Sequence, residues 1–216
     1  MKYLLATLLP CFLLVSCFEG LPENKAYEHM METEFDALAK RFDTPDRATW
    51  QKPDEVLDFM KIDKEDIVAE IGPGTGYFTF PLAGRCKKVI ALDIDTAFIN
   101  HLNREKAIRR VGNIEIRLTG RDEPKLEMME CDKVVLVNSA HQLEKTAKYL
   151  SKARKCLPIG GSVLIVDFKA GELPVGPPEQ YKLPLKKLTR ELGLAGFRSL
   201  DVDTTTLPYQ YMVRAY

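Results

Sequence analysis

Three glycines, Gly72, Gly74 and Gly76, follow a strongly apolar run of the chain in the segment EIGPGTGYF. Glycine lets a chain turn tightly and brings its backbone close to a ligand, because it carries no Cβ. A loop of this kind after a buried strand is typical of a nucleotide-type cofactor site at the carboxyl edge of an open α/β sheet. The segment therefore predicts a cofactor-binding loop.

The spacing of the glycines and the acid before them indicate which cofactor binds. Dinucleotide loops follow the pattern G-x-G-x-x-G. Here the pattern is G-x-G-x-G, and Tyr77 stands where the last glycine would be. The carboxylate of Glu70 would repel a pyrophosphate but attract the sulfonium and ammonium groups of S-adenosylmethionine (SAM). We predict that Glu70, Gly72, Gly74 and Gly76 bind SAM.

Polar residues after the next three apolar runs complete the predicted cofactor site. Asp93 ends the second run, about twenty residues after the first glycine, where a carboxylate accepts hydrogen bonds from ribose hydroxyls. Asp95 is either a further ligand or the cap of the next helix. Asp122 is expected to accept a hydrogen bond from the adenine amino group, or else is a solvated loop acid. Asn138 is assigned to the cofactor, and with Ser139 it has an alternative role in orienting a methyl acceptor.

Methyl transfer from a sulfonium is an in-line displacement that needs positioning and exclusion of water but no metal. A general base is needed only if the acceptor must lose a proton. His141, directly after the fourth apolar run, is the best candidate because imidazole exchanges protons near neutral pH. The alternative is a surface or helix-capping histidine. We interpret Asp167 and Lys169, after the fifth run, as a structural ion pair.

The elements that would position these residues alternate between short β-rich runs and helical runs. The expected strands are DIVAEIG, KKVIALDI, NIEIRLTG, DKVVLVNS and GSVLIVDF, and helical periodicity occupies residues 96–110, 144–156 and 184–195. Strands that are apolar on both faces and separated by helices predict a parallel sheet covered on both sides. The fold class is therefore α/β, a Rossmann-like doubly wound sheet.

The two ends of the chain depart from this alternation. FRSLDVDTT and YQYMVRAY read as two strands with only a short connection, which predicts a C-terminal antiparallel hairpin and a mostly parallel sheet of seven strands. Residues 31–62 form an N-terminal helical segment, in which Asp43-Thr44-Pro45 ends one helix and starts the next with Pro45 at its first position. We expect this segment to act as a lid, and Trp50 within it to serve in core or lid packing or to line an acceptor pocket.

The motifs EIGPGTG, ALDID, DKVVLVNS and LPIGGSVLIVDF together resemble those of class I SAM-dependent methyltransferases, over roughly residues 40–216. The resemblance implies a SAM-binding methyltransferase domain over 63–216. RFDTPDRATWQKPDEVL, DFKAGELPVGPP and LPYQY further resemble exported, lipoprotein-type bacterial methyltransferase-like proteins of unknown substrate. Members of that group often carry paired histidines after the fourth strand, whereas this chain has Ala140-His141-Gln142.

The first seventeen residues, MKYLLATLLPCFLLVSC, have the architecture of a signal peptide. Leu14-Val15-Ser16-Cys17 resembles the bacterial lipobox, which implies lipidation of Cys17. The alternatives are an uncleaved anchor or an ordinary secretory signal. Residues 18–30 read as a tether. We therefore expect a membrane-anchored lipoprotein facing the periplasm or the cell surface.

The charge balance limits the classes of binding partner, and the spacing of the cysteines limits the possible metal sites. The 31 basic residues balance the 31 acidic ones, so no global positive field favours nucleic acid as a partner. Cys86, Cys131 and Cys156 show no C-x-x-C spacing, so no metal site is predicted and they are interpreted as buried small hydrophobic residues.

The leading prediction is a methyltransferase acting on a small molecule or lipid. The alternatives are a catalytically silent exported binding module and, less favoured by Glu70 and Tyr77, an NAD-dependent oxidoreductase. Measuring SAM binding distinguishes the active methyltransferase from the silent module.

Overall fold

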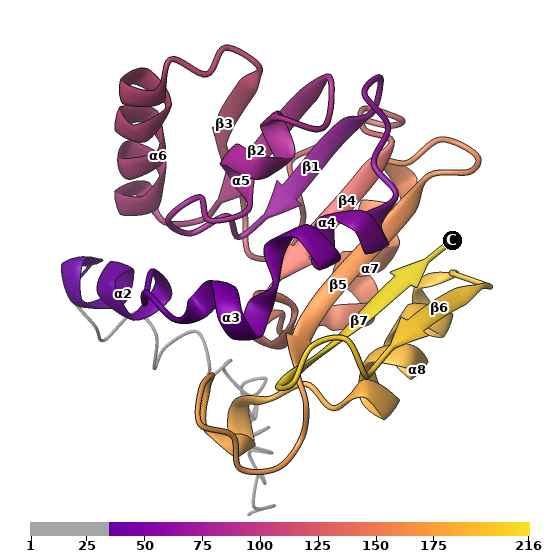
Figure 1. Cartoon of the computed structure of the whole chain (residues 1–216). Helices are drawn as coiled ribbons and strands as arrows, with labels where there is room; N and C mark the ends of the chain where they lie inside the picture. Colours follow the sequence, from indigo (N-terminus) through magenta and orange to yellow (C-terminus); the bar gives the residue numbers. More distant parts are fainter. Residues whose placement is uncertain (1–34) are drawn as a thin grey trace, which may run out of the picture.

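The computed structural model describes residues 35–216, and its centre is a seven-stranded sheet (Figure 1). The strands are β1 (Ile67–Ile71), β2 (Lys88–Asp93), β3 (Ile114–Leu118), β4 (Lys133–Val137), β5 (Ser162–Phe168), β6 (Leu200–Asp203) and β7 (Gln210–Ala215). Their order across the sheet is β3-β2-β1-β4-β5-β7-β6. The first five strands pair in parallel, and β7 pairs antiparallel with both β5 and β6. The predicted Rossmann-like sheet with an antiparallel C-terminal pair is confirmed.

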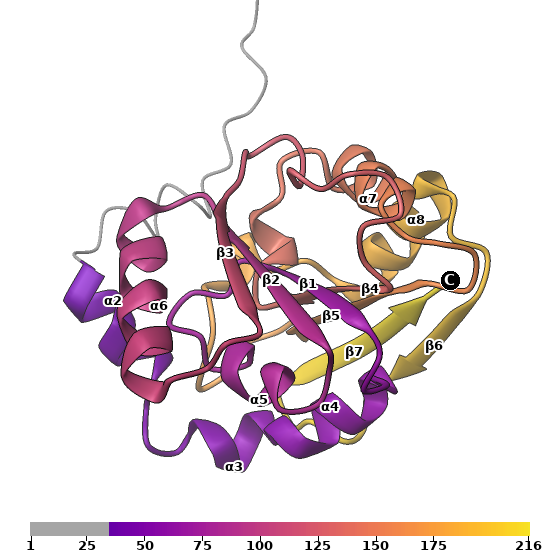
Figure 2. The same cartoon turned by 90° about the horizontal axis from the view of Figure 1, so that it is seen from above.

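Helices cover both faces of the sheet, as Figure 2 shows from above. They are α2 (Phe35–Phe42), α3 (Arg47–Gln51), α4 (Pro53–Met60), α5 (Thr79–Ala83), α6 (Thr96–Arg109), α7 (Thr146–Lys155) and α8 (Leu185–Ala195), with two short 3₁₀ turns at Ala140–Gln142 and Glu179–Tyr181. α4 and α5 lie on one face, and α7 and α8 lie on the other. α6 lies beside the β3 edge.

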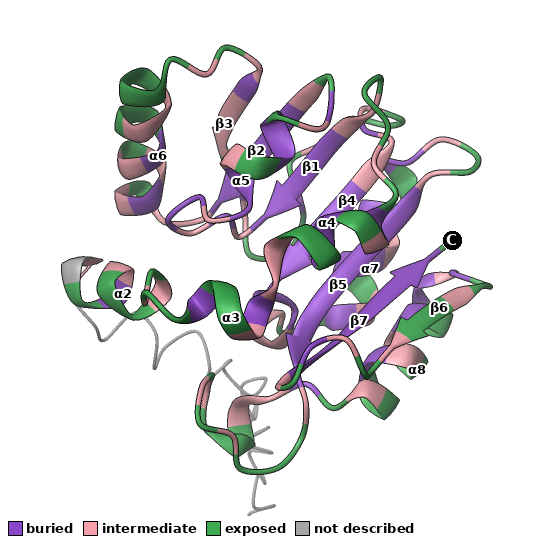
Figure 3. Cartoon of the chain, in the orientation of Figure 1, coloured by how far each residue is buried: buried purple, intermediate pink, exposed green. Residues whose placement is uncertain are grey.

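The core has two layers because successive strand residues point to opposite faces. On one face Ala69, Ile90 and Leu136 pack with residues of α7 and α8, such as Leu150 and Leu188. The other face carries the alternate strand positions, which pack with α4 and α5. The central strands are accordingly almost wholly buried (Figure 3). This explains why their sequences are apolar runs rather than alternating patterns.

The N-terminal helices differ in one detail from the expectation. α2 ends at Phe42, but α3 begins at Arg47, whose N–H donates to the Thr44 carbonyl at 3.0 Å. A turn therefore separates the helices, and Pro45 lies in that turn instead of at the first helical position.

Several predictions concern residues outside the described part of the chain. The signal peptide, the lipidation site Cys17, the tether and the first residues of the N-terminal helical segment stay predictions. Within residues 35–216, no helix has the length and apolar character needed to cross a membrane.

Candidate functional site

A cavity of about 460 Å³ opens at the carboxyl ends of the parallel strands. Such clefts, at the edge where strand order reverses, are the usual ligand sites of open α/β sheets. α2, α3 and the loop after β5 lie at this end of the sheet (Figure 1). The lining segments are 71–75, 92–94, 119–121, 137–139, 141–144 and 174–178, with Leu38, Arg41, Phe42, Thr44, Arg47, Trp50, Phe98, Tyr149, Phe168 and Tyr181.

The glycine loop forms the floor of this cavity after β1. Gly72 and Gly74 line it, whereas Gly76 does not. Gly72 has φ of 72°, and a Cβ there would lie 2.8 Å from the Cβ of Ser139. Gly76 has φ of 89°, and a Cβ there would lie 2.7 Å from the Phe80 ring. Both positions therefore need glycine, Gly72 for a close approach beneath the ligand space and Gly76 for packing the loop against the helices.

Glu70 is buried behind the loop and not on the cavity wall. Thr79 donates a hydrogen bond of 2.6 Å from its hydroxyl to Glu70 Oε2. Burial raises the pKa of Glu70 to about 7. The carboxyl group is next to the lining residue Ile71, so any charge it carries acts on the cavity through a low-dielectric layer.

Asp93 ends β2 on the cavity wall. Its carboxylate accepts hydrogen bonds from the backbone N–H groups of Gly74, at 3.3 Å, and Asp95, at 3.0 Å. Burial raises the pKa of Asp93 to about 6, an effect only partly offset by these hydrogen bonds. Asp95 caps α6 by accepting a hydrogen bond of 2.8 Å from Ala97 N–H, and it does not line the cavity.

Asp122 is separate from the other predicted ligands. It is exposed and does not line the cavity, whereas its neighbours Gly120 and Arg121 do. The loop after β3 thus reaches the cavity one or two residues earlier than the sequence suggested. Asp122 has no place in the wall described above.

His141 and Asp167 form a buried pair at the opposite side of the cavity from the β2 end. His141 Nδ1 lies 2.9 Å from Asp167 Oδ1, and His141 backbone N–H donates to Asp167 Oδ2 at 2.9 Å. Phe168 N–H donates to the same carboxylate at 2.8 Å. Because a carboxylate accepts all these bonds, Nδ1 carries the imidazole proton and Nε2 is left as an acceptor.

The expected ion pair between Asp167 and Lys169 is wrong. Successive strand residues i and i+2 share a face, but β5 ends at Phe168, so Lys169 no longer follows that alternation. Its Nζ instead donates to the carbonyls of Leu207 and Pro208, at 2.8 and 3.0 Å. Asp167 is therefore left for His141.

Asn138 lines the cavity after β4, in a left-handed conformation with φ of 58°. Its side-chain oxygen accepts a hydrogen bond from Gln210 Nε2. Ser139 also lines the cavity, but its hydroxyl donates to the Ile71 carbonyl at 2.8 Å. Ser139 thus supports the glycine loop and is not free to orient an acceptor.

The residues behind Asn138 were not singled out in the sequence. Gln51 Nε2 donates to Gln210 Oε1 at 3.0 Å, and Arg47 Nε donates to Gln51 Oε1 at 2.5 Å. A glutamine at the start of the apolar run YQYMVRAY was the one available signal for Gln210. Asp167 carried no local signal for its pairing with His141, which lies 26 positions away.

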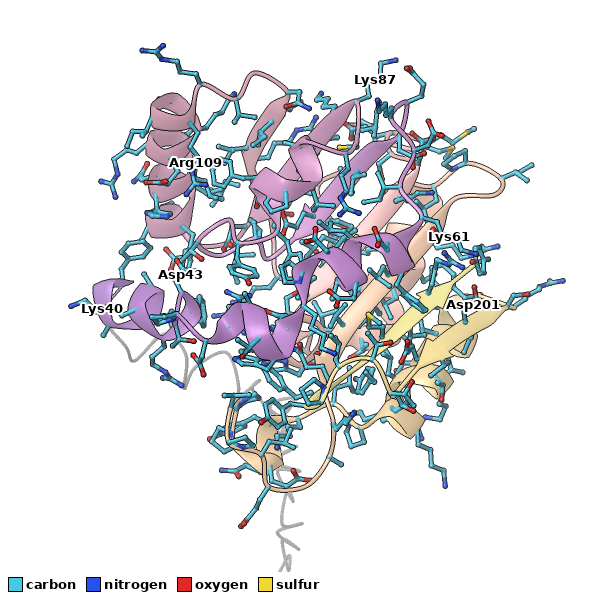
Figure 4. All side chains as sticks on the ribbon, viewed as in Figure 1. Lys40, Asp43, Lys61, Lys87, Arg109 and Asp201 are labelled. Carbon is cyan, nitrogen blue, oxygen red and sulfur yellow. The ribbon has the colours of Figure 1, made fainter. Side chains whose placement is uncertain are left out.

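The N-terminal helices close the cavity from outside. Trp50 packs against Phe168 and Tyr209, with ring centroids 6.2 and 6.3 Å apart. The carboxylate of Asp43, labelled in Figure 4, accepts a hydrogen bond of 2.9 Å from the Thr75 hydroxyl in the glycine loop. These contacts attach α2 and α3 to the cofactor loop and to the end of β5.

Groups suited to metal binding do not cluster in the described residues: no set of three or more His, Cys, Asp or Glu side chains could hold an ion there. Cys86, Cys131 and Cys156 are buried and free. Burial raises the pKa of the Cys86 thiol to about 11, which makes it a poor nucleophile. The interpretation of the three cysteines as buried small hydrophobic residues is confirmed.

The fold and the site together agree with the class that the sequence resembles. A seven-stranded sheet with β7 antiparallel, a glycine loop after β1, an acid at the end of β2 and a cavity above them are the arrangement that the resemblance to class I SAM-dependent methyltransferases implies.

Comparison with known proteins agrees with this class. A family model described as a methyltransferase domain matches residues 69–163. A ribosomal RNA small subunit methyltransferase A from Staphylococcus carnosus is 28% identical over 68% of this chain and 47% of its own length. The chain thus spans about half the length of the curated relatives that it matches.

Solved structures share the fold. A SAM-dependent methyltransferase from Aquifex aeolicus has a TM-score of 0.78 at 21% identity, covering 85% of this chain and 98% of that one. A phosphoethanolamine N-methyltransferase from Haemonchus contortus, in complex with phosphomonomethylethanolamine and S-adenosylhomocysteine, has a TM-score of 0.63 at 19% identity, covering 73% of this chain and 39% of that one. The chain is thus similar in fold to SAM-dependent methyltransferases.

Proposed function

We propose that this protein binds SAM in the cavity at the carboxyl edge of the sheet and transfers the methyl group to a small molecule or lipid. One observation carries the proposal: the glycine loop, the carboxylate of Asp93 and the imidazole of His141 all line the same cavity. The first two groups suit the cofactor, and the third suits the acceptor.

The residues present fit SAM. Gly72 and Gly74 line the cavity with backbone alone and place no side chain in it, and Asp93 offers carboxylate oxygens where ribose hydroxyls are held in folds of this type. Glu70 supplies negative charge near the loop, which favours a cationic ligand over a pyrophosphate. Asp122 is not part of this proposal, because it lies off the cavity wall.

The bound cofactor supplies an electrophilic methyl group on a sulfonium. The protein's own part is to hold the acceptor in line with that group and to keep water out. His141 Nε2 accepts the proton that the acceptor loses, while Asp167 orients the ring and stabilises the imidazolium that forms. The lid of α2 and α3 and the proline-rich segment 174–178 exclude solvent.

The charge balance and the cavity favour a small acceptor over RNA. The named relatives act on ribosomal RNA, but this chain has as many acidic as basic residues, and RNA binding draws on a positive surface. Of the arginines at the cavity, Arg47 is buried and donates to Gln51. An apolar wall that includes Trp50, Phe168 and the prolines suits an apolar acceptor.

The predicted export signal supports a lipid or envelope metabolite as acceptor, and this location is itself part of the proposal. It also keeps open a second candidate, a silent binding module, because SAM is made in the cytoplasm.

Calorimetric titration with SAM and S-adenosylhomocysteine tests the function. We expect micromolar binding by the parent protein and at least a tenfold loss in Asp93→Ala. Asp58→Ala, which removes an exposed carboxylate on α4, is the matched control and should bind like the parent. A folded protein that binds neither compound would contradict the proposal and favour the silent module.

A further inference from the structure

A chain of buried amides connects the N-terminal lid to the cavity. It runs from Arg47 on α3 through Gln51, at the end of the same helix, to Gln210 on β7 and then to Asn138 after β4. Gln51 and Gln210 are both 0% exposed. Water therefore cannot substitute for any bond in the middle of this chain.

The hydrogen bonds that link these side chains can run from donor to acceptor in only one direction. Arginine has no acceptor, so Gln51 must present its oxygen to Arg47 and its amide N–H to Gln210. Gln210 must then accept from Gln51 through its oxygen and donate from its nitrogen to Asn138. Side-chain amides are normally ambiguous in orientation, but a donor-only residue at one end removes the ambiguity.

This direction determines what Asn138 offers to the cavity. Its oxygen is engaged by Gln210, so its Nδ2 is the group left for a ligand, and no acceptor for that nitrogen is present among residues 35–216. Trp50, which also lines the cavity, has a buried indole N–H without a partner in the same part of the chain. A buried donor without a partner, such as the Trp50 indole N–H, costs about 1–3 kcal/mol, which a ligand with an accepting atom would recover. Asn138 is only half-buried, and its Nδ2 is the group that it offers to such a ligand.

We propose that the methyl acceptor reacts through a hydroxyl group on an apolar or aromatic body, held between Asn138 Nδ2 as donor and His141 Nε2 as proton acceptor. This inference rests on the proposed function and names the acceptor class for that site. Gln210 is a positioning residue, since it acts on the acceptor only through Asn138.

Electron pairs distinguish oxygen from nitrogen in this arrangement. A hydroxyl oxygen has two lone pairs, so one accepts the hydrogen bond from Asn138 while the other forms the bond to the methyl carbon. The carbon–sulfur bond breaks with its electron pair going to sulfur, and the hydroxyl proton moves to His141 Nε2. An amine nitrogen has one lone pair, which cannot both accept from Asn138 and attack the methyl group.

The body of the acceptor faces aromatic and apolar groups. Trp50 and Phe168 lie with ring centroids 6.2 Å apart, and Phe168 lies 6.5 Å from the His141 ring. Pro174 and Pro177 also line the cavity. These groups favour phenols and long-chain alcohols over strongly charged acceptors.

The first experiment compares matched hydroxyl and amine probes on the full chain: phenols with anilines that carry the same ring substituents, and dodecanol with dodecylamine. Formation of S-adenosylhomocysteine is measured, and binding is measured in the presence of S-adenosylhomocysteine. We expect each reactive hydroxyl probe to be methylated at least tenfold faster than its amine. Equal or faster methylation of the amines would overturn the proposal.

The two proposals fail in different ways. Binding of SAM without binding or methylation of any hydroxyl probe overturns the acceptor class but leaves the cofactor site standing. Absence of SAM binding by a folded protein overturns the proposed function and, with it, this inference.

Variants test the role of the amide chain. Asn138→Gly removes the donor and suits the left-handed backbone; it should lower kcat/KM for the hydroxyl probe about ten- to a hundredfold, the effect of a lost hydrogen bond to a developing charge. Gln210→Glu removes the donor to Asn138, which frees that amide to turn its oxygen toward the cavity. This variant should shift the rate ratio of hydroxyl to amine toward the amine.

The controls separate positioning from stability. Asn103→Ala removes an exposed amide on α6 and should leave both rates unchanged. If Gln210→Glu fails to fold, Asn138→Gly still decides the question. A change in SAM affinity with unchanged acceptor kinetics in Asn138→Gly would assign Asn138 to the cofactor and overturn the proposal.

Discussion

At the scale of single residues, the central feature is that His141 has its ring and its backbone N–H bound to one carboxylate. Asp167 is 0% exposed and accepts from His141 Nδ1, His141 N–H and Phe168 N–H. A carboxylate held beside the ring by these donors stabilises a positive imidazolium. The pair therefore combines a fixed orientation with the electrostatics that a general base needs.

Asp167→Asn should lower kcat by about 10²–10⁴-fold, because general-base assistance is worth that much and the amide cannot stabilise the imidazolium. The defect should shrink with an acceptor that already ionises at the assay pH, since such an acceptor needs no base. Single-turnover rates over a pH series measure both effects. A defect of the same size for ionised and neutral acceptors would contradict the assignment.

At the scale of elements, the short N-terminal helices act through a few side chains that reach the sheet. Gln51 contacts Gln210, Trp50 contacts Phe168, and Lys52 Nζ donates to the Thr206 carbonyl at 3.0 Å. α3 has only five residues and would not be stable alone. The position of α3 thus depends on these contacts with the sheet.

Trp50 is the one tryptophan in the chain, so its fluorescence reports directly on α3, which contains it. We expect binding of SAM or of an acceptor to change this fluorescence. Trp50→Ala should weaken ligand binding about tenfold while lowering the free energy of unfolding by only ~1–2 kcal/mol. Calorimetry and thermal unfolding measure the two quantities.

Tyr216→Phe serves as the aromatic control for Trp50→Ala. Tyr216 follows β7 at the other end of the sheet and donates to Asp201 at 2.8 Å, so its substitution should alter neither quantity appreciably. If Trp50→Ala lowers the free energy of unfolding but leaves ligand affinity unchanged, Trp50 serves in packing alone.

At the scale of the whole molecule, two buried acids, Asp93 on the cavity wall and Glu70 behind the glycine loop, oppose folding and favour a cationic ligand. Burial raises the pKa of Glu70 to about 7 and that of Asp93 to about 6. Between pH 4.5 and 7 the folded protein keeps a proton on Glu70 that the unfolded chain releases. The free energy of unfolding therefore falls as pH rises through this range.

Glu70→Gln should remove this pH-dependent decrease in the free energy of unfolding. The amide keeps an oxygen for the Thr79 hydroxyl but carries no charge. We expect the variant to be more stable than the parent by ~1–3 kcal/mol at pH 8 and similar to it at pH 4, as chemical unfolding at both pH values would measure. SAM affinity should fall in the same variant. A stability difference independent of pH would show that the charge of Glu70 is not responsible.

Much of the fold could be predicted because its signals are local. Apolar runs such as VVLV in β4 predict buried strands, and the short connection before YQYMVRAY predicts the antiparallel pair. The glycine loop was found for the same reason, since the three glycines stand at fixed spacing directly after an apolar run. Asp93 was found because a fixed distance along the chain separates it from that loop.

The sequence by itself determined the order of strands and helices, the glycine loop and the acid at the end of β2, because backbone conformation and strand burial depend on neighbouring residues. Only the tertiary structure decided that Asp167 pairs with His141 rather than Lys169, that Asp122 lies off the cavity, and that Gln51 and Gln210 orient Asn138. Those outcomes depend on contacts between residues up to 159 positions apart in the sequence. They depend on how helices pack on the finished sheet, which no short stretch of sequence encodes.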